Sequence, residues 1–515
     1  MKQVHKRFGV IFLALALASM ACRLTSPTPA AWLGTPTAAA REAIETSIAR
    51  TRDANPIPTD AIIFSPTVTS TDSPDQTTPE PQATPTEGEP GPWLVYPGPM
   101  SGELHAYDIS LGETVTVSLP EPVYHEDLVN GRSPDGKYIV LRAGSPENLD
   151  ELAIYQVDFS TAQTTKISPL LSISLQREIV NEEGDDAFRV LDVVTRADGL
   201  AWSPDGRFLA FSAALDNKSA DLYVFDTLND RIERVNGLFT HNASPFWSPD
   251  SNFLISQELG IFAEDEAWRV ENVLKLRIPG YDDQNTLYFP EGTSQGEVFL
   301  GWTNANNFIS YSQTADGLEA LRQTNVVTLE TILIFPGSFD QASFDSLSGW
   351  LAFSINQVQS ISSRLMSGIY LVQPGTTDYS LYRAGEFNRI TWDSSGMFIA
   401  TSDQGVFAFS PEGQNVLLAG EADARISPSG HWMVAWGDTE SGDEGMRLYQ
   451  PPNNRALQTL FEGPVTTAVW QPNSKGLFLF SANWLYQLVF PGLNPEEIAS
   501  GFSEQGEIEM IWIEE

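Results

Sequence analysis

The chain has 515 residues, of which 29 are Lys or Arg and 67 are Asp or Glu, so its formal net charge is −38. This excess of acids argues against a nucleic-acid partner, because such a binder must offer Lys and Arg to phosphates. Hydrophobic residues make up 42% of the chain, and Cys22 is its only cysteine. These values exclude wholesale disorder and a disulfide scaffold.

The amino terminus has the composition of a secretory signal. Three basic residues, Lys2, Lys6 and Arg7, precede an apolar run over residues 8–18, and small residues follow it. The run is too short to stay in a bilayer as a spanning helix. We therefore predict a signal peptide over residues 1–21.

The apolar run ends at Ser-Met-Ala-Cys, residues 19–22. This placement resembles a bacterial lipobox, which implies that Cys22 is lipidated and anchors the protein to a bacterial membrane on its extracytoplasmic side. Ser19 departs from the Leu that lipoboxes usually have. Because Ser19 and Ala21 also satisfy the small-residue rule of ordinary signal cleavage, plain secretion is the alternative.

Residues 22–91 are rich in Pro, Thr, Ser and Ala. Such a segment cannot bury enough apolar surface to offset the entropy of ordering it. We predict a flexible linker that would hold a folded domain on the order of 45 Å from the lipid.

From residue 92 onward one motif recurs, and its clearest copy is WSPDGRFLAF at 202–211. Most intervals between successive copies lie near the roughly 40–45 residues of a four-stranded propeller blade. An acidic insertion explains the longest interval, between Gly136 and Gly206. The eight copies lie at 132–139, 202–211, 247–254, 302–308, 345–351, 392–398, 426–432 and 470–475.

The motif has the chemistry of a tight hairpin. Pro presets φ, Asp caps the turn and Gly accepts positive φ. The strand that follows is apolar on successive residues, as in FLAF at 208–211, which indicates burial of both faces. A third strand follows, as in DLYVFD at 221–226. We predict an all-β fold, a single β-propeller of four-stranded antiparallel blades over residues 92–515.

The ends of this region indicate how the ring closes. The first unit, with strands at 93–96 and 104–108, lacks an opening strand, whereas residues 507–513 have the pattern of an opening strand without its hairpin. We predict that the two pair and so remove exposed sheet edges. Eight motif copies lead us to expect eight blades. Counting the composite unit would give nine, which exceeds the usual four to eight, so we allow nine as the alternative.

The hairpin W-S-P-D-G followed by L-Y-x-x-D resembles the TolB-type WD40-like repeat, here Trp202 to Gly206 and Leu222 to Asp226. The resemblance covers essentially residues 92–515. It implies a β-propeller and says little about activity, because this fold hosts unrelated functions. The amino-terminal domain of TolB has no counterpart in this sequence, so the resemblance does not imply TolB's partners.

Motifs for catalysis are weak. Gly292 to Gly296 reads G-x-S-x-G, but a nucleophile elbow needs a strand, a turn and a helix, and this segment lies between predicted strands. The only later histidine, His431, is predicted on a buried strand. His105, His125, His241 and His431 lack ligand spacing, so surface or packed positions are favoured over a zinc site.

The motif tryptophans admit two interpretations, stacking on carbohydrate or packing between neighbouring blades. Their recurrence at one strand position favours packing. These residues are Trp202, Trp247, Trp302, Trp392 and Trp470.

One local feature suggests a metal. Glu182, Glu183, Asp185 and Asp186 form a carboxylate cluster broken by Gly184 within the insertion, residues 169–196. Carboxylate oxygens are the ligands that Ca²⁺ prefers, but the spacing does not match the twelve-residue EF-hand loop. A solvated acidic loop is therefore favoured over a calcium site, and no other cofactor is expected.

We expect a surface-anchored, monomeric binding or scaffold module without enzymatic activity, in which a propeller face recognises a protein or an envelope glycan. The alternative is a propeller enzyme, a glycan hydrolase or lyase, whose carboxylates converge at the central channel. Because each blade would supply one residue to such a site, linear sequence cannot show that convergence.

Overall fold

The computed structural model describes residues 91–515 except 182–184, 217–218, 237–240, 262–267, 279–284, 288–295, 315–316, 357–364, 394, 412, 414, 438–444, 503–509 and 514–515. The predicted signal peptide, Cys22 and all of the predicted linker except Gly91 lie outside the described residues. No helix in the described part of the chain is long and apolar enough to cross a membrane.

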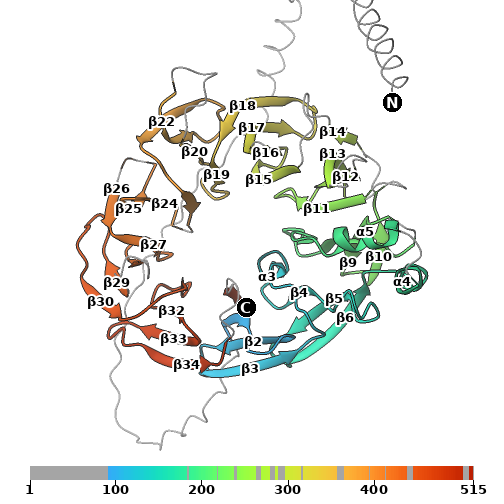
Figure 1. Ribbon diagram of the computed structural model, residues 1–515, viewed down its shortest axis with the longest axis horizontal. Helices are drawn as coiled ribbons and strands as arrows, with labels where there is room; N and C mark the ends of the chain where they lie inside the picture. Colours follow the sequence, from blue (N-terminus) through green and yellow to red (C-terminus); the bar gives the residue numbers. More distant parts are fainter. Residues whose placement is uncertain are drawn as a thin grey trace, which may run out of the picture. The chain divides into compact units, whose positions relative to one another are not determined.

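The described strands form nine antiparallel sheets that follow one another around a ring (Figure 1). Blade 1 contains β1 (Trp93–Pro97), β2 (Glu103–Asp108), β3 (Glu113–Ser118) and β35 (Ile511–Ile513). Blade 2 contains β4 (Ile139–Ala143), β5 (Ala153–Asp158) and β6 (Gln163–Pro169). Blade 3 contains β7 (Leu200–Trp202), β8 (Phe208–Ala213), β9 (Asp221–Asp226) and β10 (Arg231–Arg234). Blade 4 contains β11 (His241–Trp247), β12 (Phe253–Ile261), β13 (Trp268–Arg277) and β14 (Asn285–Leu287).

The second half of the ring repeats this order. Blade 5 contains β15 (Gly296–Asn304), β16 (Asn307–Thr314), β17 (Gly317–Asn325) and β18 (Thr331–Phe339). Blade 6 contains β19 (Gln341–Phe344), β20 (Leu351–Ile355), β21 (Gly368–Val372) and β22 (Tyr379–Ala384). Blade 7 contains β23 (Arg389–Trp392), β24 (Phe398–Ser402), β25 (Gly405–Phe409) and β26 (Asn415–Ala419). Blade 8 contains β27 (Glu421–Ile426), β28 (Met433–Gly437), β29 (Met446–Tyr449) and β30 (Gln458–Phe461). Blade 9 contains β31 (Thr467–Trp470), β32 (Gly476–Ser481), β33 (Trp484–Val489) and β34 (Glu496–Ser500).

The all-β propeller is confirmed, and it has nine blades, the number allowed beside the expected eight. The eight motif copies each mark one blade. The ninth is blade 1, whose first and second strands come from opposite ends of the propeller region and so have no hairpin between them. Counting hairpins therefore undercounts a ring that closes with a strand from the chain's end.

The predicted closure is confirmed. β35 pairs antiparallel with β1, with Trp93 opposite Ile513 and Val95 opposite Ile511. Trp512 packs 5.6 Å from Phe478 of blade 9, measured between ring centroids. The last strand thus completes blade 1 and joins it to blade 9. The earlier part of the predicted strand, residues 507–509, lies outside the described residues.

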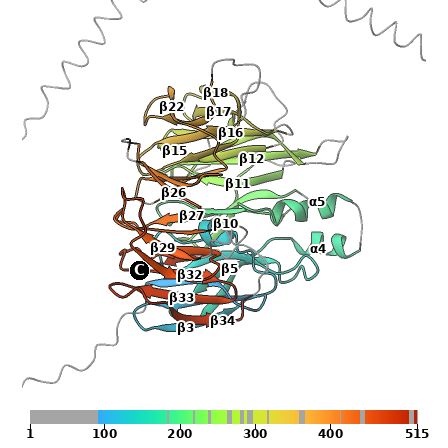
Figure 2. The same cartoon turned by 60° about the vertical axis from the view of Figure 1, so that its left-hand side comes forward.

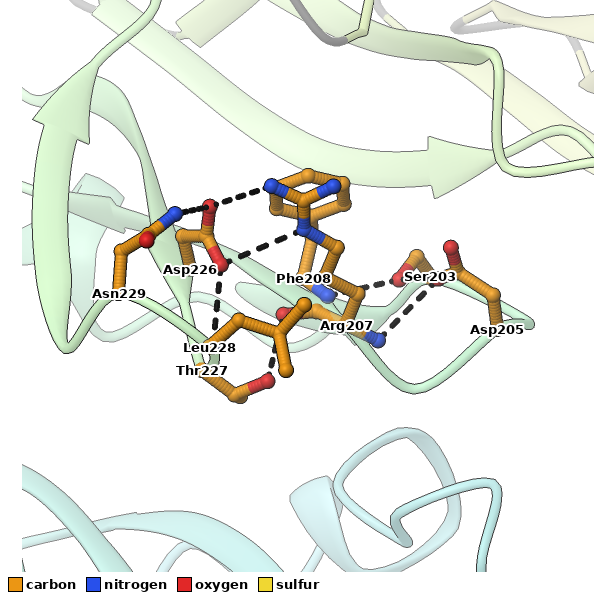
Figure 3. Close-up of polar contacts among 8 residues, drawn as sticks. All are labelled: Ser203, Asp205, Arg207, Phe208, Asp226, Thr227, Leu228 and Asn229. Carbon is orange, nitrogen blue, oxygen red and sulfur yellow. Dashed lines mark hydrogen bonds and ion pairs between the residues drawn. The ribbon is translucent and has the colours of Figure 1, made fainter.

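The recurring hairpin is held by its serine and aspartate (Figure 3). Ser203 Oγ donates to Asp205 Oδ1 at 2.6 Å and accepts from the Phe208 backbone N–H at 2.9 Å. Gly206 has a φ of 72°, which favours glycine. The same two serine bonds recur at Ser133 and Ser248, so one local geometry explains why the motif repeats.

The strand after each hairpin is buried on both faces, as its continuous apolarity predicts. All six residues of β8 are buried, as are all six of β32. The third strands β9, β5 and β21 also lie where their pattern predicts.

The motif tryptophans join neighbouring blades, which confirms packing over carbohydrate stacking. In four of them the indole Nε1 donates to a backbone carbonyl of the preceding blade at 2.9–3.0 Å. The pairs are Trp202 with Gly131, Trp247 with Ala201, Trp392 with Ser343, and Trp470 with Arg425. Trp302 is buried at the same position, but its Nε1 has no hydrogen-bond partner among the described residues.

Two hairpins carry serine at the turn position where five of the other six have glycine. Ser251 has a φ of 60° and Ser474 a φ of 59°, a region that costs a residue with a Cβ about 1 kcal/mol. This cost is offset by a hydrogen bond at each serine. Ser251 Oγ accepts from the Asp205 backbone N–H at 3.1 Å, and Ser474 Oγ accepts from the Ser429 backbone N–H at 3.0 Å. Each serine therefore bonds its turn to the turn of the preceding blade.

Blade 2 departs from the four-stranded pattern. In place of an opening strand it has the short helix α3 (Asp127–Asn130), flanked by single bridges from Val123 and Arg132 to β4. The fully buried Arg142 holds this segment through two bonds to the carboxylate of Asp127, at 2.6 and 2.8 Å. Arg142 also donates to the carbonyl of Val194. One cation thus fixes α3 near the ring's centre.

Of the predicted acidic loop, Glu182 and Glu183 lie outside the described residues, whereas Asp185 and Asp186 begin a helix. The described remainder of the insertion is largely helical. It forms α4 (Ile173–Val180) and α5 (Asp185–Val194), which project from one side of the ring (Figure 2). Ser172 caps α4 by accepting from the Leu175 backbone N–H at 3.3 Å. Leu175 and Val190 join a core cluster with Phe211 of blade 3. These apolar contacts hold the helices on the ring, and the acidic character of the insertion did not indicate them.

Candidate functional site

The first strands of blades 4, 5, 6 and 8, which are β11, β15, β19 and β27, lie nearest the ring's centre (Figure 1). Side chains alternate along such a strand. In β27, for example, Ala424 and Ile426 are buried while Asp423 and Arg425 are partly exposed. The interior surface is therefore built from alternate residues of strands that are far apart in the sequence.

A cavity of about 960 Å³ opens on this interior surface. Residues of β23, β27, β31 and β35 line it, together with Val129 of α3 and Arg132. Its walls thus come from blades 7, 8, 9, 1 and 2. The volume lies within the range typical of small-molecule sites.

The ionisable lining consists of three arginines and two aspartates: Arg132, Arg389, Arg425, Asp393 and Asp423. With all of them ionised, the lining carries a formal charge of +1. Residues 1–21 carry +3 and residues 22–91 carry −5, which leaves −36 of the total −38 on residues 92–515. The cavity lining therefore carries a net positive charge within a strongly acidic ring.

One carboxylate is shared by two arginines. Arg389 Nη1 lies 2.9 Å from Asp423 Oδ2, and Arg425 Nη1 lies 3.0 Å from both Asp423 oxygens. Arg425 also lies over the ring of Trp436, 5.5 Å from its centroid. Because Arg389 belongs to blade 7 and Arg425 to blade 8, the shared carboxylate links two blades at the cavity wall.

These guanidiniums retain hydrogen-bonding capacity. In the described part of the chain, Arg389 and Arg425 bond only through Nη1, although each guanidinium carries five N–H donors. The guanidinium of Arg132 has no hydrogen bond or ion pair with any described residue. The cavity therefore presents unused cationic donors at both of its ends.

Asp393 is the second acid of the lining. Its Oδ1 accepts from the Ser395 backbone N–H at 2.8 Å, while its Oδ2 is buried without a hydrogen-bond partner among the described residues. Burial raises the pKa of Asp393 to about 6, and the nearby charge of Asp345 acts in the same direction. Asp393 can therefore change the charge of the cavity near pH 6.

The remaining lining is mixed. Thr466 is exposed and Thr467 partly exposed, whereas Trp470 and Trp512 are nearly buried. Their ring faces are not open for stacking on a sugar. The polar groups available to a ligand here are those of the arginines, the threonine hydroxyls and the backbone groups of the inner strands.

The predicted calcium candidates stay untested. Glu182 and Glu183 lie outside the described residues, and Asp185 and Asp186 are the first two residues of α5. Among the residues that are described, no group of three His, Cys, Asp or Glu side chains is placed to hold a metal ion.

The weak catalytic motifs are not assembled into a site. Gly296 begins β15, so a strand rather than a helix follows the G-x-S-x-G segment, whose other residues lie outside the described part of the chain. The prediction that His431 lies on a buried strand is wrong. His431 is exposed in the turn before β28, because the buried run begins two residues later at Met433.

Sequence reasoning missed the arginines of the cavity. A signal existed, since polar residues alternate with apolar ones just before the motif position, as in Arg389-Ile390 and Asp423-Ala424-Arg425. Arg132 stands at the motif position itself, where five of the other seven copies have Trp. Only closure of the ring shows that these positions share one cavity.

The fold defines this chain as a β-propeller protein. No protein-family profile matches the chain, and no curated protein matches its sequence. Solved structures resemble it in fold. One is the structure of a eukaryotic initiation factor, which is 14% identical with a TM-score of 0.47; the match covers 82% of this chain and 98% of that one.

Two further neighbours come from bacteria. Dipeptidyl peptidase 4 of Porphyromonas gingivalis is 12% identical with a TM-score of 0.46, and the match covers 77% of this chain and 64% of the peptidase. TolB from Acinetobacter baumannii is 15% identical with a TM-score of 0.30, over 57% of this chain and 65% of TolB. In both cases the match spans less than two thirds of the neighbour, and the likeness concerns the propeller fold alone.

Proposed function

We propose that this protein is a non-enzymatic binding module of the bacterial cell surface, and that its ligand, a glycan or a segment of protein, enters the cavity inside the ring. The observation that carries this proposal is the cavity of about 960 Å³ with cationic donors that no described residue occupies. The lipidated Cys22 and the linker would hold the ring beyond the membrane, and a closed ring would work as a monomer.

Blocking the cavity tests the proposal. Thr466 is exposed and lines the cavity, so Thr466→Trp fills it without replacing a buried residue. Thr116, exposed on β3 of blade 1, gives the matched control Thr116→Trp. Immobilised wild-type protein and both variants are exposed to an envelope extract. We expect only Thr466→Trp to lose the captured ligand; equal capture by all three proteins would refute the site.

Membrane anchoring has a separate test. Cys22→Ser removes the only thiol that a lipid can occupy. We expect the parent chain to incorporate labelled palmitate and to partition into the detergent phase, and the variant to do neither. A parent chain that carries no label would be the secreted form.

A propeller enzyme is the second candidate, because Asp393 and Asp423 line the same cavity and the pKa of Asp393 is raised to about 6. A carboxyl group with such a pKa can act as a general acid near neutral pH. Incubation with envelope glycans, followed by mass spectrometry, tests this candidate. Cleavage that stops in Asp393→Asn would replace the binding proposal.

A further inference from the structure

The contacts of Asp423 show what the cavity arginines can hold. A guanidinium is planar and matches a carboxylate with paired donors. Arg389 and Arg425 reach the same carboxylate from two blades, at 2.9 and 3.0 Å. The carboxylate of Asp423 uses only part of the donor capacity of these two arginines. Their remaining N–H donors are available to an anionic group of a ligand.

Arg132 extends the cationic lining to the other end of the cavity. It belongs to blade 2, and blades 9 and 1 lie between it and blade 8. A ligand with a single anionic group could use one end only. A ligand whose anionic groups are spaced along its length would pair with Arg132 and with Arg389 and Arg425 together.

The charge of the whole ring limits the size of such an anion. Residues 92–515 carry −36, so a long polyanion or an acidic protein surface is repelled wherever it extends beyond the cavity. Screening confines the attraction of the arginines to within about 8 Å at physiological ionic strength. Only an anion small enough to enter the cavity gains the attraction without most of the repulsion.

Taking these observations together, we infer that the ligand of the cavity is a small polycarboxylate, either a short uronate oligosaccharide or a free di- or tricarboxylic acid, bound by Arg389 and Arg425 at one end and Arg132 at the other. This inference rests on the proposed function, because it names the chemical class of ligand for the same cavity. An acidic protein segment is excluded by it and is an outcome of the test below.

Calorimetric titration of the mature protein with defined probes tests the ligand class. The probes are a β-1,4-linked trisaccharide of mannuronic acid, the neutral β-1,4-mannotriose as its matched control, and citrate. We expect the uronate or citrate to bind at least tenfold more tightly than mannotriose, and which of the two binds better identifies the source of the carboxylates. Equal affinity for charged and neutral trisaccharides would overturn the inference.

Two variants with opposite expected signs test the residues. Arg389→Gln removes a charge-assisted donor and is expected to weaken the uronate or citrate complex about 10- to 100-fold. Asp423→Asn removes the competing anion and is expected to strengthen it several-fold. Arg231→Gln is the control, because Arg231 lies exposed on β10, paired with Glu233, and its loss changes the net charge equally. A thermal melt of each variant verifies folding. Weakening by Arg231→Gln as large as by Arg389→Gln, or no gain from Asp423→Asn, would contradict the assigned roles.

Thr466→Trp separates failure of the inference from failure of the proposed function. If it abolishes capture from the envelope extract while neither carboxylate probe binds the wild-type protein, the cavity binds a ligand of another class and the inference alone fails. Capture of an acidic protein through the cavity would likewise overturn the inference about the ligand while leaving the proposed function in place. If Thr466→Trp leaves capture unchanged and neither probe binds, both fail.

Discussion

Replacing Trp247 by Phe tests whether the indole hydrogen bonds hold neighbouring blades together. Trp247 is 5% exposed, lies stacked on Phe208 with 5.9 Å between ring centroids, and donates from Nε1 to the carbonyl of Ala201 at 3.0 Å. The change keeps an aromatic ring at the site but removes the donor. It therefore leaves the Ala201 carbonyl without its partner from blade 4.

The chain supplies its own control in Trp302. This residue occupies the same position of blade 5 and is 6% exposed, but its Nε1 has no partner among the described residues. Trp302→Phe loses a similar amount of packing, about 1–2 kcal/mol, and breaks no hydrogen bond. Trp247→Phe loses this packing and, in addition, about 1–3 kcal/mol for the bond and the unpaired carbonyl.

The measurement is equilibrium unfolding in urea, followed by far-ultraviolet circular dichroism. If the slope with denaturant is unchanged, the shift in midpoint reports the change in unfolding free energy. We expect Trp247→Phe to be the less stable of the two variants by about 1–3 kcal/mol. Equal losses in both variants would refute the role of the indole bond and leave packing alone as the reason for the recurring tryptophan.

Three further changes probe the same structure. Ser251→Ala should lower the unfolding free energy by about 1 kcal/mol, because it breaks the hydrogen bond to the Asp205 backbone while keeping a Cβ at a φ of 60°. Ser251→Gly should recover most of that loss, because glycine accepts this φ without strain. Equal midpoints in urea for the two variants would contradict this reasoning. Because burial raises the pKa of Asp393 to about 6 from an ordinary 3.8, the folded state binds its proton more tightly, so the unfolding free energy falls as pH rises from about 4 to beyond 6. Asp393→Asn should remove this pH dependence, so that its unfolding free energy rises by about 2 kcal/mol relative to that of the wild type between pH 4.5 and 8. If the difference in unfolding free energy between the two proteins stays constant with pH, Asp393 does not titrate in this range. Arg142→Met should destabilise the protein by about 3–5 kcal/mol in urea, because it leaves the carboxylate of Asp127 buried and unpaired, and a loss below 1 kcal/mol would mean that this ion pair does not hold α3.

Much of the fold could be predicted because its determinants are local. The bonds of Ser203 and Asp205 lie within one turn, and the burial of β8 follows from four successive apolar residues. The closure by β35 was also visible, since an unpaired first strand and a spare last strand each carry a sheet-edge pattern. These features depend on a few neighbouring residues that one sequence displays directly.

What could not be predicted depends on contacts between distant segments. Helices α4 and α5 were not predicted, because the residues that anchor them, such as Leu175 and Val190, are stabilised by packing with residues of blade 3, among them Phe211. The cavity depends on even more distant segments. Arg132 and Arg389 lie more than 250 residues apart in the sequence, and only the closed ring of nine blades makes them walls of one cavity.

A crystal structure of the mature protein with the mannuronic acid trisaccharide would test the central claim most directly. The account predicts ligand density inside the ring, with a carboxylate about 2.7–2.9 Å from guanidinium nitrogens of Arg389 and Arg425, and a second carboxylate facing Arg132. Density confined to the outer surface, or a trisaccharide in the cavity whose carboxylates face away from all three arginines, would contradict it.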